Sequence, residues 1–290
     1  FIGRGVYGCS AYCIERYSAY ALSAFHTAFN LCNVLILIWF IKPMEKIICK
    51  IIREKEDGED FKVKFISAGL MSTAELSLFE ARKEINLFAA RTQKMFRMVP
   101  ELLEMKDEND FVKLFARIEK YEGISDNMEI EIANYLNKVS EGRLSPESKT
   151  NIQSMLREIS EIESIGDSCY NMARAINRKF RSKEDFTENQ YGHIKHIMQL
   201  CDNALTNMID VISDLASADA NRTLNLENEI NDYRKLLKEK NVTDIENQEY
   251  SYQMGVHYMD VPKENNQSTT NVVRVLNGIG FQLPNVLIKK

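Results

Sequence analysis

The feature that most constrains the fold is an uninterrupted helical spacing of apolar residues over two long segments. In the first segment, apolar or small side chains recur every three or four residues: Phe111, Leu114, Ile118, Tyr121, Ser125, Met128, Ile132, Tyr135 and Val139. The second segment follows the same spacing with Ile152, Met155, Ile159, Ile162, Gly166, Cys169, Ala173 and Ile176. This spacing gathers the side chains into one stripe of a helix, and such stripes are buried when helices pack in a bundle.

The scarcity of helix breakers extends this interpretation to most of the chain. Between Met44 and Val261 the only prolines are Pro100 and Pro146, and we expect both at helix boundaries. Ser145 is expected to cap the helix that Pro146 begins. Further apolar stripes with helical spacing cover residues 78–99, 191–215 and 226–237. The sequence therefore predicts an all-α fold of long antiparallel helices.

Each of the two long segments carries a Glu-x-x-x-Asp pair directly beside its apolar stripe. The pairs are Glu122 with Asp126 and Glu163 with Asp167. Residues four apart lie on the same face of a helix, so each pair presents two carboxylates together. If the two helices pack against each other, the four carboxylates form one cluster. Such a cluster repels itself unless a cation lies within it.

Small residues stand where the two acidic faces would meet. Ser125 and Gly166 are the smallest members of the two stripes, and each lies beside the aspartate of its pair. They would allow the helices to approach closely. We therefore predict a divalent or trivalent metal ion bound by four carboxylates, those of Glu122, Asp126, Glu163 and Asp167. A solvated acidic flank on each helix, binding no metal, is the alternative that the pattern leaves open.

A region near the start of the chain has the composition of a membrane span. Residues 19–41 contain no Asp, Glu, Lys or Arg. As a helix, an uncharged stretch of this length is long enough to cross the hydrocarbon core of a membrane. Basic residues follow it directly: Lys42, Lys46, Lys50, Arg53 and Lys55. By the positive-inside rule, the side after the helix is cytoplasmic. We predict a transmembrane helix at about 19–41 and an amphipathic linker over 44–55 on the membrane surface; a buried helix of a large soluble protein is the alternative.

Polar side chains share one face of this predicted span. His26, Asn30 and Asn33 follow a spacing of four and three residues. Such a face in a membrane helix is expected to contact other membrane helices or a water-filled path. We therefore expect upstream transmembrane helices, and interpret the chain as a fragment of a longer protein or as an interrupted reading frame.

Composition and missing motifs exclude several classes of function. A net charge of −5 and a pI near 5.6 argue against nucleic-acid binding. The six cysteines form no Cys-x-x-Cys motif, which is typical of reduced, apolar thiols. A di-metal oxidase would need Glu-x-x-His pairs, and none of the four histidines follows a Glu by three residues. Without a nucleophile–base pairing or a Gly-rich phosphate loop, we predict that the chain is not an enzyme.

The order of helices begins to repeat in the second half. The residues from Glu227 to Asn231 occupy the place that Glu122 to Asp126 hold in the first half. A full repeat would place a second acidic pair at 266 and 270, but the sequence there is Asn-Gln-Ser-Thr-Thr. We predict that the helix begun near Tyr250 stops by about Pro262, leaving the second repeat incomplete and the tail irregular. We interpret the tail as the product of a frameshift, with a divergent tail as the alternative.

The repeated helical unit and its acidic pairs resemble those of a known family. A three-helix unit repeated twice, with Glu-x-x-x-Asp on the second helix and Glu-x-Ile-Gly-Asp on the third, resembles PhoU. The runs 135–145 and 161–167 are similar to the PhoU-like domain of bacterial Na+/phosphate cotransporters. The run from Ala24 to Asn30 resembles the opening of the last transmembrane helix of those transporters.

The resemblance implies an organisation, a location and a function. It implies a membrane segment with its linker over 1–57, a first PhoU-like repeat over 58–182 and an incomplete second repeat over 183–261, with the divergent tail at 262–290. It implies Na+-driven uptake of inorganic phosphate across the bacterial inner membrane, with the bundle cytoplasmic and regulatory. The Gln-Ser-Ser-Ser transport motifs are not in this sequence, so the sodium and phosphate sites are expected upstream.

Two further points follow from the resemblance. The acidic pairs of PhoU bind metal ions, which implies the same role for the four carboxylates named above. The partners implied are the lipid bilayer, upstream membrane helices and, through the full-length parent, phosphate and sodium; oligomerisation is left open. The alternative function is a membrane-anchored helical scaffold of phosphate signalling without transport activity.

Overall fold

A computed structural model describes residue 20 and residues 22–35, 63–66, 73–142, 144–182, 184–214 and 220–279. The chain divides into two compact units, Phe1–Glu59 and Asp60–Lys290. In the first unit, residues 22–35 form a helix whose side chains are exposed. His26, Asn30 and Asn33 all lie on this helix.

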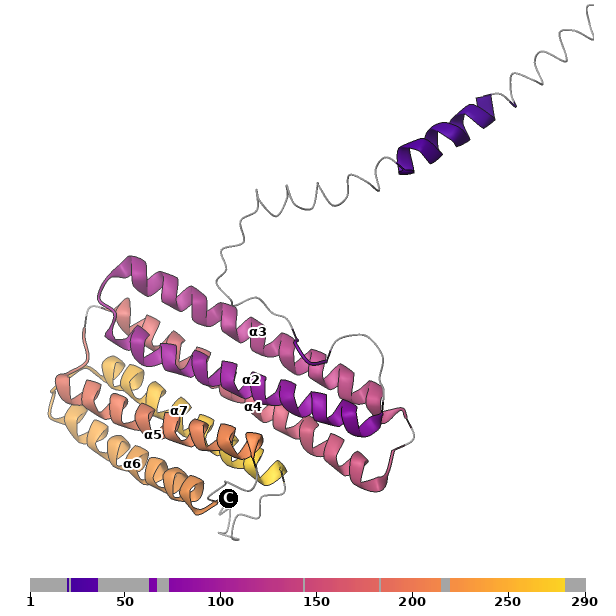
Figure 1. Cartoon of the computed structure of the whole chain (residues 1–290). Coiled ribbons are helices and arrows are strands. Elements are labelled where there is room, and N and C mark those ends of the chain that lie inside the picture. Colours follow the sequence, from indigo (N-terminus) through magenta and orange to yellow (C-terminus); the bar gives the residue numbers. More distant parts are fainter. Residues whose placement is uncertain are drawn as a thin grey trace, which may run out of the picture. The chain divides into compact units, whose positions relative to one another are not determined.

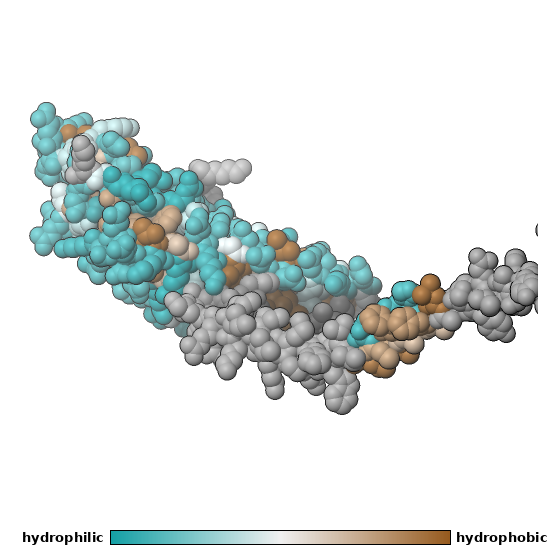
Figure 2. Space-filling view, turned by 90° about the horizontal axis from the view of Figure 1, so that it is seen from above, coloured by the Kyte–Doolittle hydropathy of each residue, from teal (hydrophilic) through white to brown (hydrophobic). Residues whose placement is uncertain are grey.

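The predicted transmembrane helix at about 19–41 is not confirmed. In the part of the chain that the structure describes, no helix combines the length and the hydrophobicity needed to cross a membrane. Residues 36–41 of the predicted span and the predicted linker at 44–55 lie outside the described residues. The short helix 22–35 nevertheless carries large apolar side chains, and it is mostly brown in the space-filling view, whereas the visible face of the bundle is mostly hydrophilic (Figure 2).

Long helices running side by side build the described part of the second unit (Figure 1). They are α2 (Ala74–Glu104), α3 (Glu108–Ser140), α4 (Pro146–Phe180), α5 (Glu188–Ser213), α6 (Ala220–Glu246) and α7 (Tyr252–Gly278). Helices α2, α3 and α4 pack against one another, while α7 packs against both α5 and α6. The two sets meet mainly where α4 contacts α7 and where α2 contacts α5. The predicted all-α architecture of long packed helices is confirmed in the described residues.

Local sequence explains where the helices begin. Thr73, Asp107, Ser145, Thr187 and Ser251 are N-caps, and each side chain accepts a hydrogen bond from a backbone N–H of the first turn. These bonds satisfy amides that have no partner within the helix. The prediction that Ser145 caps a helix with proline in its first turn is confirmed.

The apolar stripes form the core. In α4 all eight predicted stripe residues are buried, and in α3 eight of the nine are. The exception is Tyr135, which is partly exposed and donates a hydrogen bond from its hydroxyl to Glu80 Oε2 at 3.1 Å, while the neighbouring Leu136 is buried instead. A tyrosine at the edge of a stripe keeps its hydroxyl near polar partners, whereas leucine has no such need.

The prediction that the first long helix ends at Pro100 is wrong. Helix α2 continues through Pro100 to Glu104. Proline lacks an N–H, so the helix loses one backbone hydrogen bond at that point. Leu102 and Leu103, in the additional turn, are buried in the core. Burial of two leucines contributes roughly 3–6 kcal/mol, which offsets the cost of about 3 kcal/mol for an interior proline.

The prediction that the last helix stops by Pro262 is also wrong. Helix α7 runs without interruption from Tyr252 to Gly278, so the second three-helix set is complete through this helix. Val261 and Pro262 are themselves buried. Val272, Val275 and Leu276 extend the apolar face beyond the proline. Burial of these residues in the core keeps the helix continuous at Pro262, although local helix propensity favours an end there.

The polar run after Pro262 is accommodated through hydrogen bonds to the helix itself. Ser268, Thr269 and Thr270 each donate a side-chain hydroxyl to the carbonyl four residues earlier, at 3.0–3.1 Å. The Asn265 side-chain amide donates in the same way to the Val261 carbonyl at 3.0 Å. These bonds satisfy polar groups that would be costly to bury unpaired, whereas Asn265 Oδ1, Asn266 Oδ1 and Asn271 Nδ2 are buried without a hydrogen-bond partner in the described structure. Residues 262–278 of the predicted divergent tail are therefore part of helix α7, while residues 280–290 lie outside the described part of the chain.

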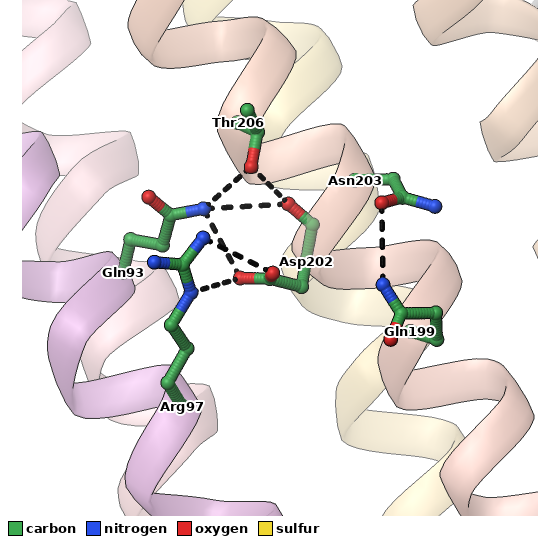
Figure 3. A network of polar contacts seen from close by, with 6 residues as sticks. All are labelled: Gln93, Arg97, Gln199, Asp202, Asn203 and Thr206. Atoms are coloured by element: carbon green, nitrogen blue, oxygen red, sulfur yellow. Dashed lines mark hydrogen bonds and ion pairs between the residues drawn. The ribbon is translucent and has the colours of Figure 1, made fainter.

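A polar network joins the two helix sets along the contact between α2 and α5 (Figure 3). Arg97 donates to both carboxylate oxygens of Asp202, through Nε at 2.9 Å and Nη2 at 3.2 Å. The Gln93 amide donates to Asp202 Oδ1 at 3.0 Å and to Thr206 Oγ1 at 2.7 Å. These side chains fix the register of α2 against α5.

Candidate metal centre

The structure brings carboxylates from α3 and α4 together. One carboxylate oxygen each from Glu122, Asp126 and Asp167 lie within 4.8 Å of one another. Glu122 and Asp126 come from neighbouring turns of α3, and Asp167 comes from α4. The two helix faces that carry the acidic pairs therefore meet, as the sequence predicts. Among the described residues, these three are the potential metal ligands that lie close enough together to bind a single ion.

Glu163, the fourth predicted ligand, lies beside this group rather than in it. Its own burial, together with the charges of Asp167, Glu129 and Asp126, raises the pKa of Glu163 to about 7. Its carboxylate also accepts a hydrogen bond from the Ser164 hydroxyl at 3.3 Å. Glu163 nevertheless interacts with the group, because a side-chain hydrogen bond between Glu163 and Asp167 lowers the pKa of Asp167 and so opposes the effect of burial.

The cluster pushes other carboxyl groups toward their protonated forms. Burial raises the pKa of Glu122, and the charges of Asp126, Asp167 and Glu119 add to the effect. Burial also raises the pKa of Asp167, with a further contribution from Asp126. Each shift reflects negative charges held close together in partly desolvated positions. A bound cation would reverse this penalty.

The approach of α3 to α4 at the cluster depends on small residues. A Cβ atom built on Gly166 would lie 2.8 Å from Ser125 Oγ and 3.3 Å from Ser125 Cβ. Ser125 is buried and its hydroxyl has no hydrogen-bond partner in the described structure. The predicted role of Ser125 and Gly166 in close helix packing is therefore confirmed by the geometry.

A matched pair of glycine substitutions tests this contact. Gly123→Ala places a methyl group where no atom lies within 4 Å, so it should stabilise the fold by about 0.5–1 kcal/mol through helix propensity. Gly166→Ala gains the same propensity but overlaps Ser125, which costs about 1–3 kcal/mol. Urea unfolding should show Gly166→Ala as the less stable variant, and Ser125→Gly should recover part of the loss. Equal stability of the two alanine variants would contradict the close contact.

The titration of Glu163 gives a testable pH dependence in metal-free protein. Its pKa of about 7 lies above the ordinary 4.5, so the folded state holds this proton more tightly than the unfolded state. The stability from this group is therefore fully present below about pH 4.5 and is lost as the pH rises through about 7. Urea unfolding with a chelator should show this loss, and Glu163→Gln should flatten it. An unchanged slope in the variant would show that Glu163 titrates normally.

Sequence reasoning missed two members of the acidic face. Glu129 contributes to the raised pKa of Glu163, and Glu119 contributes to that of Glu122. Glu119 also accepts a hydrogen bond from the Tyr170 hydroxyl at 3.0 Å. The signal was available, because residues 119, 122, 126 and 129 follow intervals of three and four and so share one helix face.

The donor set fits a hard cation. Carboxylate oxygens are the ligands that Mg²⁺, Ca²⁺ and Mn²⁺ prefer, and the group offers no thiolate or imidazole. Burial raises the pKa of Glu122 and of Asp167, and neighbouring carboxylates raise both further, so a positive partner would favour the ionised ligands. Glu122, Asp126 and Asp167 would hold the ion, and Glu163 lies near enough to complete the set.

The corresponding position of the second helix set is chemically different. On α6 and α7, Glu227, Asn231, Asn266 and Thr270 stand where the repeat would place four acids. Burial raises the pKa of Glu227, while the positive charge of Arg274 lowers it. Arg274 also forms an ion pair with Glu161 of α4, at 3.6 Å, so this position holds one carboxylate near an arginine, and the two halves of the bundle differ in charge.

Comparisons with known proteins find the same helical fold. Residues 85–176, which include all four predicted ligands, match the PhoU domain family. The solved structure of the phosphate transport system regulatory protein PhoU from Streptococcus pneumoniae is similar, with a TM-score of 0.60 and 13% identity. The alignment covers 74% of this chain and 100% of that one. PhoU from Pseudomonas aeruginosa has a TM-score of 0.63 at 13% identity, over 72% of this chain and 100% of that one.

No protein with a curated description matches the sequence significantly. The domain match and the two structural similarities nevertheless agree on the same fold, and the acidic cluster lies inside the matched residues. Residues 85–176 are therefore similar to the PhoU domain family, and the helical bundle that contains them has the fold of the two PhoU structures.

Proposed function

We propose that this chain is a metal-binding regulatory domain of a phosphate transport system. The observation that carries the proposal is the convergence of Glu122, Asp126 and Asp167, within 4.8 Å, inside the PhoU-matching residues. The similar pneumococcal protein is described as a phosphate transport system regulatory protein, which supports the same role here. A regulatory role requires a switchable contact and no catalytic group.

The proposed switch is the contact between α3 and α4. Without a cation, the carboxylates of the cluster repel across this contact, and Glu163 is held close to half protonated near neutral pH. A bound cation would supply a positive charge shared by both helices. Glu122 and Asp126 would then be tied to Asp167, and the packing of Gly166 against Ser125 would be reinforced. The exposed acidic face would change in charge as well as in rigidity.

We further propose that the regulated transporter is a Na+/phosphate cotransporter of the bacterial inner membrane, with the bundle on its cytoplasmic side. The sequence from Ala24 to Asn30, the polar face of His26, Asn30 and Asn33, and the basic residues after position 41 support this proposal. The sodium and phosphate that are transported would bind to the transporter part, outside this chain. A membrane-anchored scaffold of phosphate signalling is the second candidate.

Phosphate uptake in cells tests the regulatory role. In a Pseudomonas aeruginosa strain that lacks its own PhoU, expression of this chain should change the rate of labelled phosphate uptake. The double variant Asp126→Asn/Asp167→Asn should lose the effect, while the exposed-acid variant Glu131→Gln should keep it. Liposomes containing only this chain should take up no phosphate. Uptake by such liposomes, or an unchanged rate in cells expressing the wild-type chain, would contradict the proposal.

A further inference from the structure

A cavity lies at the end of the bundle where α2 and α4 finish and α5 begins. Its volume is about 580 Å³, within the range of sites for small organic molecules. Lys106, Lys179 and Lys195 line it, together with an apolar wall that includes Leu103, Met105 and Phe180. The acidic cluster of α3 and α4 contributes no residue to it.

The base of the cavity holds a buried cation. The side chain of Lys179 is 10% exposed, and its ammonium lies over the rings of Phe186 and Tyr191, at 5.3 and 5.0 Å from their centres. The ammonium forms an ion pair with Asp185 and donates a hydrogen bond to the Tyr191 hydroxyl. A buried lysine requires such a compensating anion, because an unpaired buried charge is costly.

Three donors converge on a single oxygen of that anion. Lys179 Nζ contacts Asp185 Oδ1, the Tyr191 hydroxyl donates to it at 2.7 Å, and the Phe186 backbone N–H donates to it at 2.8 Å. This is the arrangement of a receptor for an anionic oxygen, assembled from α4, α5 and the loop between them. Although burial opposes it, hydrogen bonding from Lys179 and Tyr191 lowers the pKa of Asp185, so this carboxylate stays ionised.

The residue that fills this receptor is itself mostly in solvent. The side chain of Asp185 is 71% exposed, whereas the lysine that it neutralises is nine-tenths buried. Asp185 can therefore leave the receptor at little cost to packing, provided that another anion takes its place. A ligand oxygen arriving through the cavity would meet the same three donors.

The other charged groups of the cavity favour an anionic ligand. The two remaining lining acids already have partners: Glu104 pairs with Lys195 at 2.5 Å, and Glu184 accepts a hydrogen bond from the Ser251 hydroxyl at 2.6 Å. Lys106 has no ion-pair partner among the described residues, and so it is available to a ligand.

We propose that this cavity binds a small molecule carrying a phosphate group, whose oxygens displace Asp185 from Lys179, Tyr191 and the Phe186 amide. Lys106 neutralises part of the remaining charge, while Lys195 stays paired with Glu104. The apolar wall and the volume accommodate an organic body attached to the phosphate. The site is separate from the metal centre and does not depend on the proposed function.

Ligand binding would be transmitted through the loop that carries Asp185. This loop connects the two helix sets, and Glu184 in the same loop holds Ser251, the N-cap of α7. Release of Asp185 thus loosens a loop that touches both halves of the bundle.

Calorimetric titration of the purified full chain tests the site in chelator-containing, metal-free buffer, so that phosphate cannot bind through a cation on the acidic cluster. The probes are adenosine monophosphate, inorganic phosphate and adenosine. Adenosine monophosphate should bind and adenosine should not. Binding of inorganic phosphate with equal affinity would support the receptor and assign it to free phosphate, whereas failure of both phosphates to bind would overturn the proposal.

The decisive variant is Asp185→Asn, which removes the competing charge. It should bind adenosine monophosphate at least about tenfold more tightly, corresponding to about 1.4 kcal/mol, the low end for a hydrogen bond to a charged group. If Asp185 only anchors the loop, the variant should bind no better than wild type, and this result would overturn the proposal.

A second variant keeps the test independent of loop stability. Lys106→Ala changes an exposed residue and should weaken binding by about fivefold, the factor for about 1 kcal/mol at an exposed ion pair. Lys106 lies just before the start of α3, whereas Lys138 lies in the last turn of that helix. Lys138→Ala removes an equal charge far from the cavity and should leave binding unchanged. Equal affinities in the two lysine variants would contradict the assignment of the cavity.

Discussion

Replacing Arg82 with methionine is expected to lower the free energy of unfolding by about 3–5 kcal/mol, because it leaves a buried carboxylate without its cation. The side chain of Glu158 on α4 is 0% exposed, and that of Arg82 on α2 is 28% exposed. The guanidinium contacts both carboxylate oxygens of Glu158, with Nη2 at 3.2 Å from Oε1. Urea unfolding of the full chain measures the loss.

The same ion pair reaches across to the second helix set. The Ser154 hydroxyl lies 3.1 Å from Glu158 Oε1 and also contacts the carbonyl of Gly278 at the end of α7. Loss of Arg82 is therefore expected to weaken the contact of α4 with α7 as well as that with α2. Hydrogen exchange should show faster exchange in the last turn of α7 in the variant.

Two controls separate a buried charge from a missing contact. The double variant Arg82→Met/Glu158→Leu should recover most of the lost stability, because it removes the charge together with its partner. Lys113→Met removes one member of an exposed ion pair, in which Lys113 and Asp110 are 76% and 60% exposed, and should change stability by about 0–1 kcal/mol. Equal losses in Arg82→Met and Lys113→Met would contradict the account.

Replacing Asp126 with asparagine is expected to have opposite effects on the metal-free and the metal-bound protein. Without metal, the change removes a charge that contributes to the raised pKa values of Glu122, Glu163 and Asp167, so the fold should become more stable. With metal, the change removes a ligand, and the affinity for the metal should fall by at least about 100-fold. Loss of a residue that only hydrogen-bonds to a ligand already lowers metal affinity by up to about 100-fold.

Thermodynamic linkage makes both effects visible in one experiment. Metal at about 100 times its dissociation constant should stabilise the wild-type fold by about 2.7 kcal/mol. The same concentration should have almost no effect on Asp126→Asn. Glu131→Gln, on an exposed part of α3, should respond to metal as the wild type does. Metal-dependent stabilisation that survives Asp126→Asn would place the ion elsewhere.

The apolar spacing predicted most of the fold because it depends on one physical rule. Every predicted stripe residue of α4, from Ile152 to Ile176, is buried, because a helix in a bundle must bury its apolar face. The same rule, applied to two helices at once, predicted that the acidic faces meet beside Ser125 and Gly166. Three of the four predicted carboxylates then converged.

The errors arose where tertiary contacts outweigh local propensity. Pro100 and Pro262 were expected to end helices, but burial of the residues around them keeps α2 and α7 continuous. The polar run after Pro262 suggested an irregular tail. Its side chains instead bond to carbonyls one turn back, as the Thr269 hydroxyl does to Asn265 at 3.0 Å. The exact positions of side-chain oxygens, such as those that leave Glu163 outside the converging group, do not follow from helical spacing.

The most direct test of the central claim is the location of a bound ion by anomalous X-ray diffraction from crystals grown with Mn²⁺. The account predicts one strong peak between α3 and α4, with carboxylate oxygens of Glu122, Asp126 and Asp167 at about 2.0–2.5 Å, near the distances typical of oxygen ligands. Glu163 is expected to turn toward the ion. Crystals saturated with Mn²⁺ that show no peak at this position, or a peak only at other surface carboxylates, would contradict the metal centre.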